Sequence, residues 1–383
     1  MSIIIYVLLS LLLIAFVVQL GFYLVPYTAI LRHNRRLRKG NVPHMVAQPP
    51  VSIIICARNE GDNLRRFLPL VLEQNYNDYE VIVVNDGSWD DTEKIIKDFQ
   101  SDYKNLYITN IPQETRIISH KKLAITVGVK AAKNEILLFT DADCRPLTPD
   151  WIATMVRNFD DNTEFVLGHG NYYRYPGFVS RMVSYDTLTI AMQYMGFAML
   201  GFPYMGVGRN MAYRRSTFFR LKGFAGFLHV ASGDDDLLIN AFGKGHNTRI
   251  EPSLDAETLS LPKTTLRDWF YQKKRHLSTV DVYKSNSKMW IGLEPLTRGL
   301  FYLAVILLIA LAPTNWVVIA IALGALALRF LLQLLVINLT ARHYNDRTFG
   351  FDIIIFDIIL PLFTLYILTI DKIFTRKAKF FWK

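Results

Sequence analysis

Long uncharged stretches near the two ends of the chain constrain its fold more than any other feature of the sequence. Residues Ile3 to Val25 carry no charge, and Gly299 to Ile337 is apolar apart from one arginine and a few amides. A third stretch, Phe351 to Ile370, is apolar apart from two aspartates. About 20 apolar residues span a bilayer as a helix. The sequence therefore predicts an N-terminal transmembrane anchor at 1–30, a soluble domain at 51–285, and a C-terminal membrane region at 290–383 with helices at about 299–312, 316–337 and 351–370.

A basic linker at 31–50 follows the anchor and predicts the orientation of the chain. Its charges are Arg32, Arg35, Arg36, Arg38 and Lys39, and such clusters remain on the cytoplasmic side. The first stretch is too long for a cleaved signal peptide and has no charged residues before it. We therefore expect an integral membrane protein, in the cell membrane, with a cytoplasmic soluble domain. The net charge of +10 lies mostly beside membrane segments, which favours anionic membrane lipids over nucleic acid as partners.

The last apolar stretch raises a conflict. A third full crossing would carry a basic tail to the outside, whereas such a tail belongs inside. Pro361, near the middle of the stretch, cannot donate a backbone hydrogen bond. We expect the segment either to bend at Pro361 and re-enter or to lie along the inner face, with its polar groups against the soluble domain; three simple crossings are the alternative. The tail charges are Lys372, Arg376, Lys377, Lys379 and Lys383.

The soluble region alternates between strand-like and helix-like segments. This alternation predicts βαβ units, and hence an α/β fold with a mostly parallel sheet. The two cysteines, Cys56 and Cys144, end strand-like runs. A cytosolic domain keeps such thiols reduced, so we expect neither a disulfide nor a zinc site. The expected strands are 51–56, 79–85, 106–108 and 135–140, and the expected helices are 62–74, 90–100 and 123–132.

Three polar segments directly follow predicted strands: 57–60, 86–88 and 141–143. Ligands of such sheets bind beyond the carboxyl ends of the strands. The third segment contains Asp141 and Asp143, and two carboxylates at this spacing can share a Mg²⁺ or Mn²⁺ ion. A metal there would neutralise the charge that develops on a nucleotide diphosphate leaving group.

These segments, in this order and together with the run Lys121-Lys-Leu-Ala124, resemble the family 2 glycosyltransferases, which have a GT-A fold. The resemblance covers about residues 50–280. It implies that Glu60 and Asp86 hold the uridine of the donor and that Lys121, rather than Lys122, contacts its nucleotide end. It also implies that Asp141 faces the sugar and nucleotide while Asp143 binds the metal. Thr126 stands where the family usually has asparagine, which puts one local hydrogen bond in doubt.

The run Ser232-Gly-Asp-Asp-Asp-Leu-Leu238 is the next candidate. By itself it could be an acidic first turn of a helix, which favours the helix dipole. An inverting transfer needs a general base to deprotonate the acceptor hydroxyl. The resemblance implies that this base lies in the run, at Asp235 if Leu238 is the leucine of the motif, or at Asp234 if the match is offset by one.

Acceptor-side residues are also implied by the resemblance. Gln272-Lys-Lys-Arg275-His276 resembles the family motif Gln-x-x-Arg-Trp, with Gln272, Arg275 and His276 beside the acceptor and pyrophosphate; the alternative is a basic helix on the membrane. An arginine can chelate phosphate oxygens. Arg209 and Asn210, in a glycine-rich piece, would frame the acceptor pocket. The preceding stretch, Thr187 to Pro203, is either an interfacial helix or a buried core helix.

The sequence as a whole predicts a metal-dependent, inverting hexosyltransferase. Its donor would be a nucleotide sugar, most simply a UDP-sugar, and its acceptor a lipid or lipid-linked saccharide. A processive polysaccharide synthase that couples elongation to export is the alternative. A non-catalytic scaffold is disfavoured because both the metal and the base carboxylates are present. A homo- or hetero-oligomer stays open.

Overall fold

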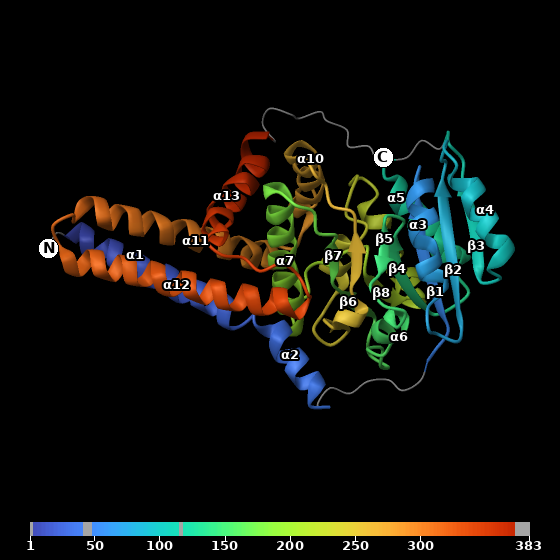
Figure 1. Ribbon diagram of the computed structural model, residues 1–383, viewed down its shortest axis with the longest axis horizontal. Coiled ribbons are helices and arrows are strands. Elements are labelled where there is room, and N and C mark those ends of the chain that lie inside the picture. The colour runs from blue at the N-terminus through green and yellow to red at the C-terminus, as the bar shows by residue number, and fades with distance from the viewer. Residues whose placement is uncertain (1–2, 41–47, 115–117, 372–383) are drawn as a thin grey trace.

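The computed structural model describes residues 3–40, 48–114 and 118–371. An α/β domain lies at one end, and long apolar helices extend from it (Figure 1). Helices α1 (Ile3–Leu24), α11 (Ser285–Leu311) and α12 (Trp316–His343) run side by side away from the domain. Together with α13 (Asp352–Tyr366), these helices give four segments that are long and apolar enough to cross a membrane. Helix α11 begins at Ser285, 14 residues before the expected start at 299. Its first turns extend out of the soluble domain before the sequence becomes apolar.

The central sheet has seven strands in the order β3-β2-β1-β4-β8-β6-β9. Pairs β3–β2, β2–β1, β1–β4 and β6–β9 are parallel, and only β8 runs antiparallel to its neighbours β4 and β6. The predicted α/β fold with a mostly parallel sheet is therefore confirmed. The strands are β1 (Val51–Ala57), β2 (Tyr79–Asp86), β3 (Leu106–Ile111), β4 (Ile136–Asp141), β6 (Phe165–Gly168), β8 (Met211–Arg214) and β9 (Thr248–Glu251). A second sheet has the order β5-β10-β7, from β5 (Cys144–Pro146), β7 (Gly170–Tyr172) and β10 (Thr258–Ser260).

Helices cover both faces of the large sheet. Successive side chains of a strand point to opposite faces, so Ile53 and Ile55 of β1 pack with α3 (Gly61–Leu72), α4 (Thr92–Asp102) and α6 (Trp151–Val156). Ile54 and Cys56 pack on the other face with α5 (His120–Ala131) and α7 (Phe178–Met199). Both cysteines are buried and unpaired. The remaining helices are α2 (Ala29–Arg38), α8 (Arg215–Arg220), α9 (Asp236–Phe242) and α10 (Leu266–Leu277).

Helix α7 joins the sheet to the apolar helices. Of the two interpretations of 187–203, the structure supports the buried core helix over the interfacial helix. Helix α7 begins at Phe178, and most of its residues are buried in the core. It also touches the turn that follows α1: a Cβ on Gly196 would lie 2.2 Å from the backbone oxygen of Pro26. Only glycine permits this approach. The expected basic linker starts as helix α2, whose last turn carries Arg35, Arg36 and Arg38.

Helix α13 bears on the predicted path of the last apolar stretch. The helix is continuous through Pro361, and both paths, re-entry or lying along the inner face and a full crossing, stay predictions. It stands across the inner end of the bundle, beside α7 and α12 (Figure 1). Asp352, at its start, forms an ion pair with Arg181 of α7, so one polar group of this segment does face the α/β domain. The basic tail at 372–383 lies outside the described residues.

Charged side chains between the apolar helices satisfy one another. Arg329 of α12 is 1% exposed and donates to Asp357 of α13 at 2.7 Å and to Gln19 of α1 at 2.9 Å. Gln333 and Arg298 also bond the Asp357 carboxylate, at 2.9 and 3.2 Å. Because hydrocarbon offers no alternative partner, an intramembrane charge needs such a network. The network ties all four apolar helices together.

The Asp357→Asn variant tests this network. Removing one partner of a buried ion pair costs about 3–5 kcal/mol, because the other charge is left uncompensated. We expect a markedly lower thermal unfolding temperature of the detergent-solubilised protein. Glu93→Gln is the matched control, since Glu93 forms an exposed pair with Lys97 at 2.6 Å that contributes about 0.5 kcal/mol. Equal unfolding temperatures for the two variants would contradict the assignment.

Candidate active site

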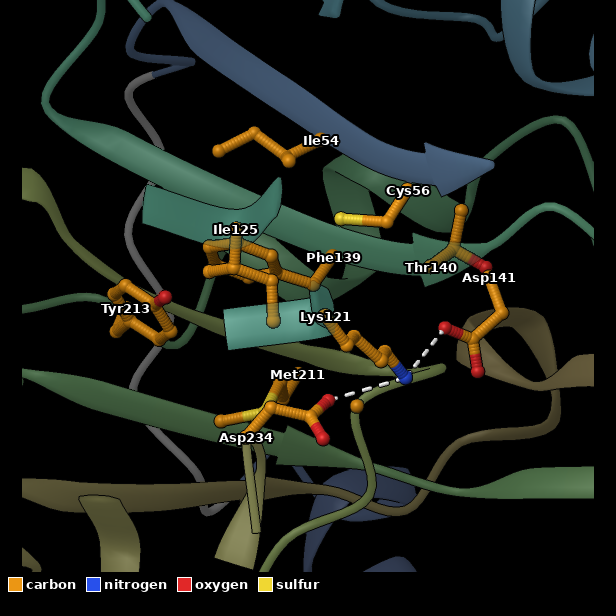
Figure 2. Close-up of a pocket in the computed structure, with 11 residues that line it drawn as sticks. Ile54, Cys56, Lys121, Ile125, Phe139, Thr140, Asp141, Met211, Tyr213 and Asp234 are labelled. Atoms are coloured by element: carbon orange, nitrogen blue, oxygen red, sulfur yellow. Dashed lines mark ion pairs between the residues drawn. The ribbon is translucent and has the colours of Figure 1, made fainter. Parts of the chain in front are cut away.

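Lys121 connects the two halves of a polar site at the carboxyl edge of the large sheet. It lies in the first turn of α5, and its ammonium is 3.0 Å from Asp141 Oδ1 and 3.1 Å from Asp234 Oδ2 (Figure 2). Asp141 ends β4, in register with Cys56 near the end of β1. The predicted convergence of strand ends thus brings Asp141 to Lys121, and Lys121 in turn reaches the acidic run before α9.

The neighbouring residue Lys122 has a different role. Its side chain is fully buried, and its ammonium donates to the backbone oxygens of Phe227 and Val230 at 2.9 and 2.7 Å. These carbonyls belong to the segment that leads into Asp234 and Asp235. Lys122 therefore holds the backbone of this segment, and only Lys121 presents its charge to the site.

Asp86 and Glu60 lie on the same edge, at the ends of β2 and β1. Asp86 is almost fully buried, and its carboxylate is 3.1 Å from His120 Nδ1 and 3.4 Å from Arg58 Nη1. Glu60 accepts a hydrogen bond from Asn63 at 2.6 Å. Burial, and then the charges of Asp143 and Asp141, raise the pKa of Glu60 to about 7.

Sequence reasoning missed Arg58 and His120. A signal for both was present, since Arg58 lies inside the polar segment 57–60 and His120 directly precedes Lys121. The guanidinium of Arg58 also lies 5.7 Å from the ring centre of Trp89, whose side chain is 71% exposed. The loops after β1 and β2 are joined, because Trp89 donates its backbone N–H to Asn59 at 3.0 Å.

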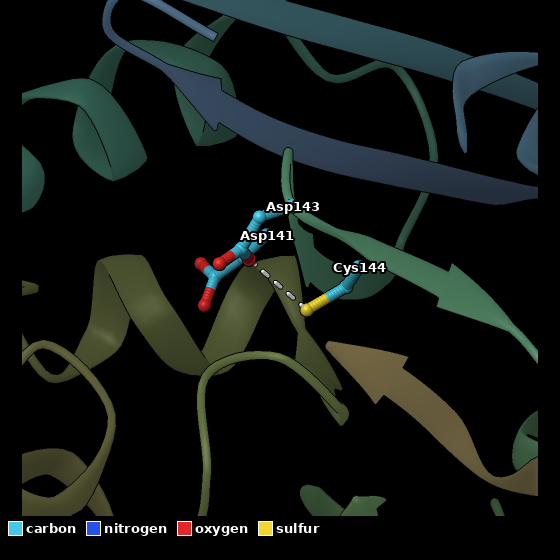
Figure 3. Close-up of side chains that lie close together, drawn as sticks. All are labelled: Asp141, Asp143 and Cys144. Carbon is cyan, nitrogen blue, oxygen red and sulfur yellow. Dashed lines mark hydrogen bonds between the residues drawn. The ribbon is translucent and has the colours of Figure 1, made fainter. Parts of the chain in front are cut away.

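Asp141, Asp143 and Cys144 form a compact group whose ligand atoms lie within 4.8 Å of one another (Figure 3). Burial, and then the charge of Asp141, raise the pKa of Asp143. Burial raises the pKa of Cys144 well above its usual range, and its thiol donates to Asp143 at 3.3 Å. The protonated thiol is a poor ligand, whereas two crowded carboxylates suit a hard cation such as Mg²⁺ or Mn²⁺. The residues present therefore fit a divalent metal.

The three consecutive acids before and at the start of α9 have three different environments. Asp234 faces Lys121, and this attraction outweighs burial, so its pKa is lowered. Asp235 accepts from the backbone N–H groups of Gly208 and Asp236 at 2.9 and 2.8 Å, yet burial and then the charge of Asp234 raise its pKa. Asp236 turns away and accepts from the hydroxyl groups of Thr279 and Tyr283, both at 2.5 Å. Neighbouring carboxyls whose pKa values are pushed apart are typical of acid–base sites.

A second cavity, of about 210 Å³, lies on the other side of Asp235. Arg209, Gln272 and His276 line it together with Asp235. Arg209 and Gln272 both donate to the hydroxyl of Tyr172, at 2.7 and 3.0 Å. The His276 ring is open to this cavity, but the surrounding protein, and then the charges of Arg275 and Lys273, hold its pKa well below the usual range. We call this space the acceptor-side cavity.

Arg275 lies on α10 three positions after Gln272 and directly before His276. Its guanidinium Nη2 is 3.5 Å from His276 Nε2. It is not among the residues that line the acceptor-side cavity.

Residues 52–221 match the model of a family described as glycosyl transferase family 2. This segment belongs to glycosyl transferase family 2. The glycosyltransferase AglE of Haloferax volcanii is 31% identical over 143 residues, which cover 37% of this chain and 45% of that protein. The probable glycosyltransferase YdaM of Bacillus subtilis is 26% identical over 247 residues, covering 61% and 57%. The dolichyl-phosphate beta-glucosyltransferase ALG5D of Trichomonas vaginalis is 33% identical over 101 residues, covering 24% and 30%.

The chain therefore spans about half, or less, of the length of these curated relatives. A likeness among solved structures covers nearly the whole chain. The mannosyltransferase PcManGT from Pyrobaculum calidifontis, solved in complex with GDP-Man and Mn²⁺, has a TM-score of 0.57 and 19% sequence identity, and the match covers 97% of this chain and 100% of that one. At this identity the likeness shows a shared fold, the GT-A type, including the apolar helices.

One site prediction in the glycosyltransferase domain needs correction. Asn210 does not face the acceptor-side cavity: its side chain is fully buried. Its amide donates to the backbone oxygens of His169 and Ala256 at 2.7 and 2.6 Å, and its oxygen accepts from Trp151 at 3.0 Å. All of its bonding groups are thus used within the fold. The side chain of its neighbour Arg209 points into the cavity instead.

Glu257, in the α/β domain beside strand β10, generates a pH prediction. It is 2% exposed and accepts from Asn171 at 2.9 Å, and burial raises its pKa to about 8. The folded state thus holds this proton more tightly than the unfolded state does. Stability from this group is fully present below the ordinary glutamate range and is lost as the pH rises toward about 8, at about 1.4 kcal/mol per pH unit.

Glu257→Gln removes this titration while keeping the shape of the side chain. We expect its unfolding temperature to depend less on pH than that of the wild type between about pH 6 and 8. Thermal unfolding of both proteins in a matched buffer series measures the difference. Parallel pH profiles would show that Glu257 is ionised in the folded protein.

Proposed function

We propose that the chain transfers a sugar, with inversion, from a nucleotide-sugar donor to a lipid or lipid-linked acceptor at the membrane. The single observation that supports this most is the position of Asp234 and Asp235 between two spaces. Asp234 is paired with Lys121 on the donor side, and Asp235 lines the acceptor-side cavity. A displacement with inversion needs such a base across from the leaving group.

The donor would lie along the carboxyl edge of the sheet. Asp86, fixed between His120 and Arg58, would accept hydrogen bonds from the nucleoside, and Glu60 would contribute a second carboxylate. The exposed ring of Trp89 beside Arg58 offers a surface on which a nucleobase could stack. We favour a UDP-sugar because Glu60 and Asp86 stand at positions that resemble the uridine-binding positions of family 2 glycosyltransferases.

Asp143, with Asp141, would hold a Mg²⁺ or Mn²⁺ ion. When bound, this ion neutralises charge on the departing diphosphate. Lys121 pairs with Asp141 beside this metal position, and Arg275 would add a cation for the phosphates. Asp235 takes the proton of the acceptor hydroxyl, and the backbone N–H groups of Gly208 and Asp236 fix its orientation.

The acceptor-side cavity faces the apolar helices, which supports an acceptor at the membrane. The processive alternative would need a path for a polymer between these helices. Apolar side chains of α1, α11 and α12, among them Leu12, Phe301 and Ala322, pack tightly against one another in the described part of the bundle. This packing favours a transferase without export. We propose that the catalytic domain is cytoplasmic, next to the basic turn of α2, and that α13 lies along this face.

Removing the metal is one test of this function. Activity with a labelled nucleotide sugar should vanish in excess chelator and return with Mg²⁺ or Mn²⁺. Asp143→Asn should abolish turnover, because one of two carboxylate ligands is lost. Asp62→Asn, at an exposed position on α3, serves as the control. Full turnover in excess chelator would remove the metal from the mechanism.

The base is tested by Asp235→Asn. We expect kcat to fall by about 10² to 10⁴, the usual contribution of general-base catalysis. Nucleotide affinity, measured by calorimetry, should change little because Asp235 faces the acceptor-side cavity. Asp234→Asn should instead weaken nucleotide binding, because it releases Lys121. The reverse pattern would move the base to Asp234.

A further inference from the structure

The acceptor-side cavity continues into a second, larger space that opens among the apolar helices. This groove has a volume of about 610 Å³ and lies between α7, α10, α11 and α13. Six residues line both spaces: Asp186, Ile190, Gln193, Lys273, Leu277 and Ile291. The two spaces therefore adjoin along α7 and α10, and a molecule that enters from the bilayer can reach Asp235 without crossing the donor half of the site.

The groove has the lining that a hydrocarbon chain requires. Leucines of α11 and of residues 360–368 line it, with Pro361 among them. Glu294 and Arg298, which form an ion pair with each other, and tyrosines such as Tyr23 and Tyr185 also line it. Two glycines of α11, Gly292 and Gly299, also line it, and a Cβ at either position would meet nothing within 4 Å. They stand seven residues apart, and hence on one face of the helix. Helix α11 thus leaves room in the groove at these two positions, on either side of Pro295 and Leu296.

The inner cavity, in contrast, suits a neutral sugar better than a phosphate. Of the cations that line it, Lys273 is paired with Asp186 at 2.6 Å, whereas Arg209 donates to the neutral groups of Tyr172 and Gly170 and keeps its charge. Asp235 adds a further negative charge that would repel an anionic head group. Aromatic side chains make up much of the remaining wall, and their faces and polar tips suit sugar rings. They are Tyr172, Tyr194, Tyr204, Trp269 and Tyr283.

The chemistry of the nucleophile points the same way. A phosphate monoester is largely ionised near neutral pH, with a second pKa of about 6, so its oxygen can attack without losing a proton to the protein. A sugar hydroxyl keeps its proton until the transition state and needs a general base beside it. A carboxylate held by two backbone N–H groups beside this cavity is useful to a hydroxyl, which has a proton to lose, and not to an ionised phosphate.

We propose that the acceptor is a glycolipid whose saccharide occupies the acceptor-side cavity and whose hydrocarbon chain lies in the groove between α11 and α13. This inference rests on the proposed function only in taking Asp235 as the base. In the transfer, the acceptor oxygen forms a bond to the anomeric carbon, and its proton goes to Asp235. The bond from that carbon to the nucleotide diphosphate breaks, and the diphosphate leaves with the electron pair.

Photo-crosslinking of the full-length protein in lipid nanodiscs tests the binding part without any donor. The probe is dodecyl glucoside with a diazirine in its alkyl chain. We expect crosslinked peptides from α11 and α13, and competition by unlabelled dodecyl glucoside at least about tenfold stronger than by dodecyl phosphate. Gly299→Phe, which fills the groove, should reduce crosslinking about tenfold or more. Gly324→Phe on α12 is the matched control, because its Cβ also meets nothing within 4 Å and it does not line the groove.

Gly292→Phe is the second variant, so that a folding defect of one variant does not decide the result; gel filtration and thermal unfolding accompany both. Crosslinking of both variants at the wild-type level, or stronger competition by dodecyl phosphate, would overturn the inference. Transfer to a polyprenyl phosphate but to no alkyl glycoside would overturn it too, while leaving glycosyl transfer intact. Binding of the glucoside probe in the groove, with no sugar transfer from any nucleotide sugar, would uphold the lipid site and count against the proposed function.

Discussion

The ammonium of Lys121 stands between two carboxylates that belong to opposite parts of the domain. Asp141 ends a central strand of the parallel half of the sheet, and Asp234 lies in the segment that leads into α9. Without this cation the two carboxylates would repel each other, and the two parts of the domain that carry them would lose this connection. The ion pair also separates the roles of the neighbouring acids. Asp234 is paired with Lys121 on the donor side, whereas Asp235 lines the acceptor-side cavity.

The sequence was most informative where physical rules are local. Buried strands and the polar segments after them could be predicted because strand ends of a parallel sheet meet at one edge, and Asp86, Lys121 and Asp141 do meet there. It was least informative where a side chain chooses among partners that are distant in sequence. Asn210 is directed into the fold by His169, Ala256 and Trp151, contacts that no motif announces.

The same limit applies to the apolar helices. Pro361 favours a bend, yet α13 is continuous through it, because a helix packed against neighbours can keep its helical course around one missing bond. The charges of Asp352 and Asp357 suggested contact with the soluble domain. One does pair with Arg181 of α7, whereas the other is held by arginines of α11 and α12. The positions of Asp352 and Asp357 in the sequence do not show which of the two pairs with the α/β domain. Helix α13 also stacks Phe363 on Trp269 of α10 at 4.7 Å, so the helix bearing Gln272 and His276 packs directly on one of the apolar helices.

The ion network among the apolar helices has a consequence for how the chain is made. Gln19 leaves the ribosome 310 residues before its partner Arg329 does, and Arg329 in turn waits for Asp357, 28 residues further on. Since domains fold as they are synthesised, the α/β domain can form before α12 and α13 have been made. Only the last stretch of translation supplies the carboxylate that pairs with Arg329. A chain that stops before α13 would leave this arginine buried among apolar helices without its carboxylate, which is a costly defect.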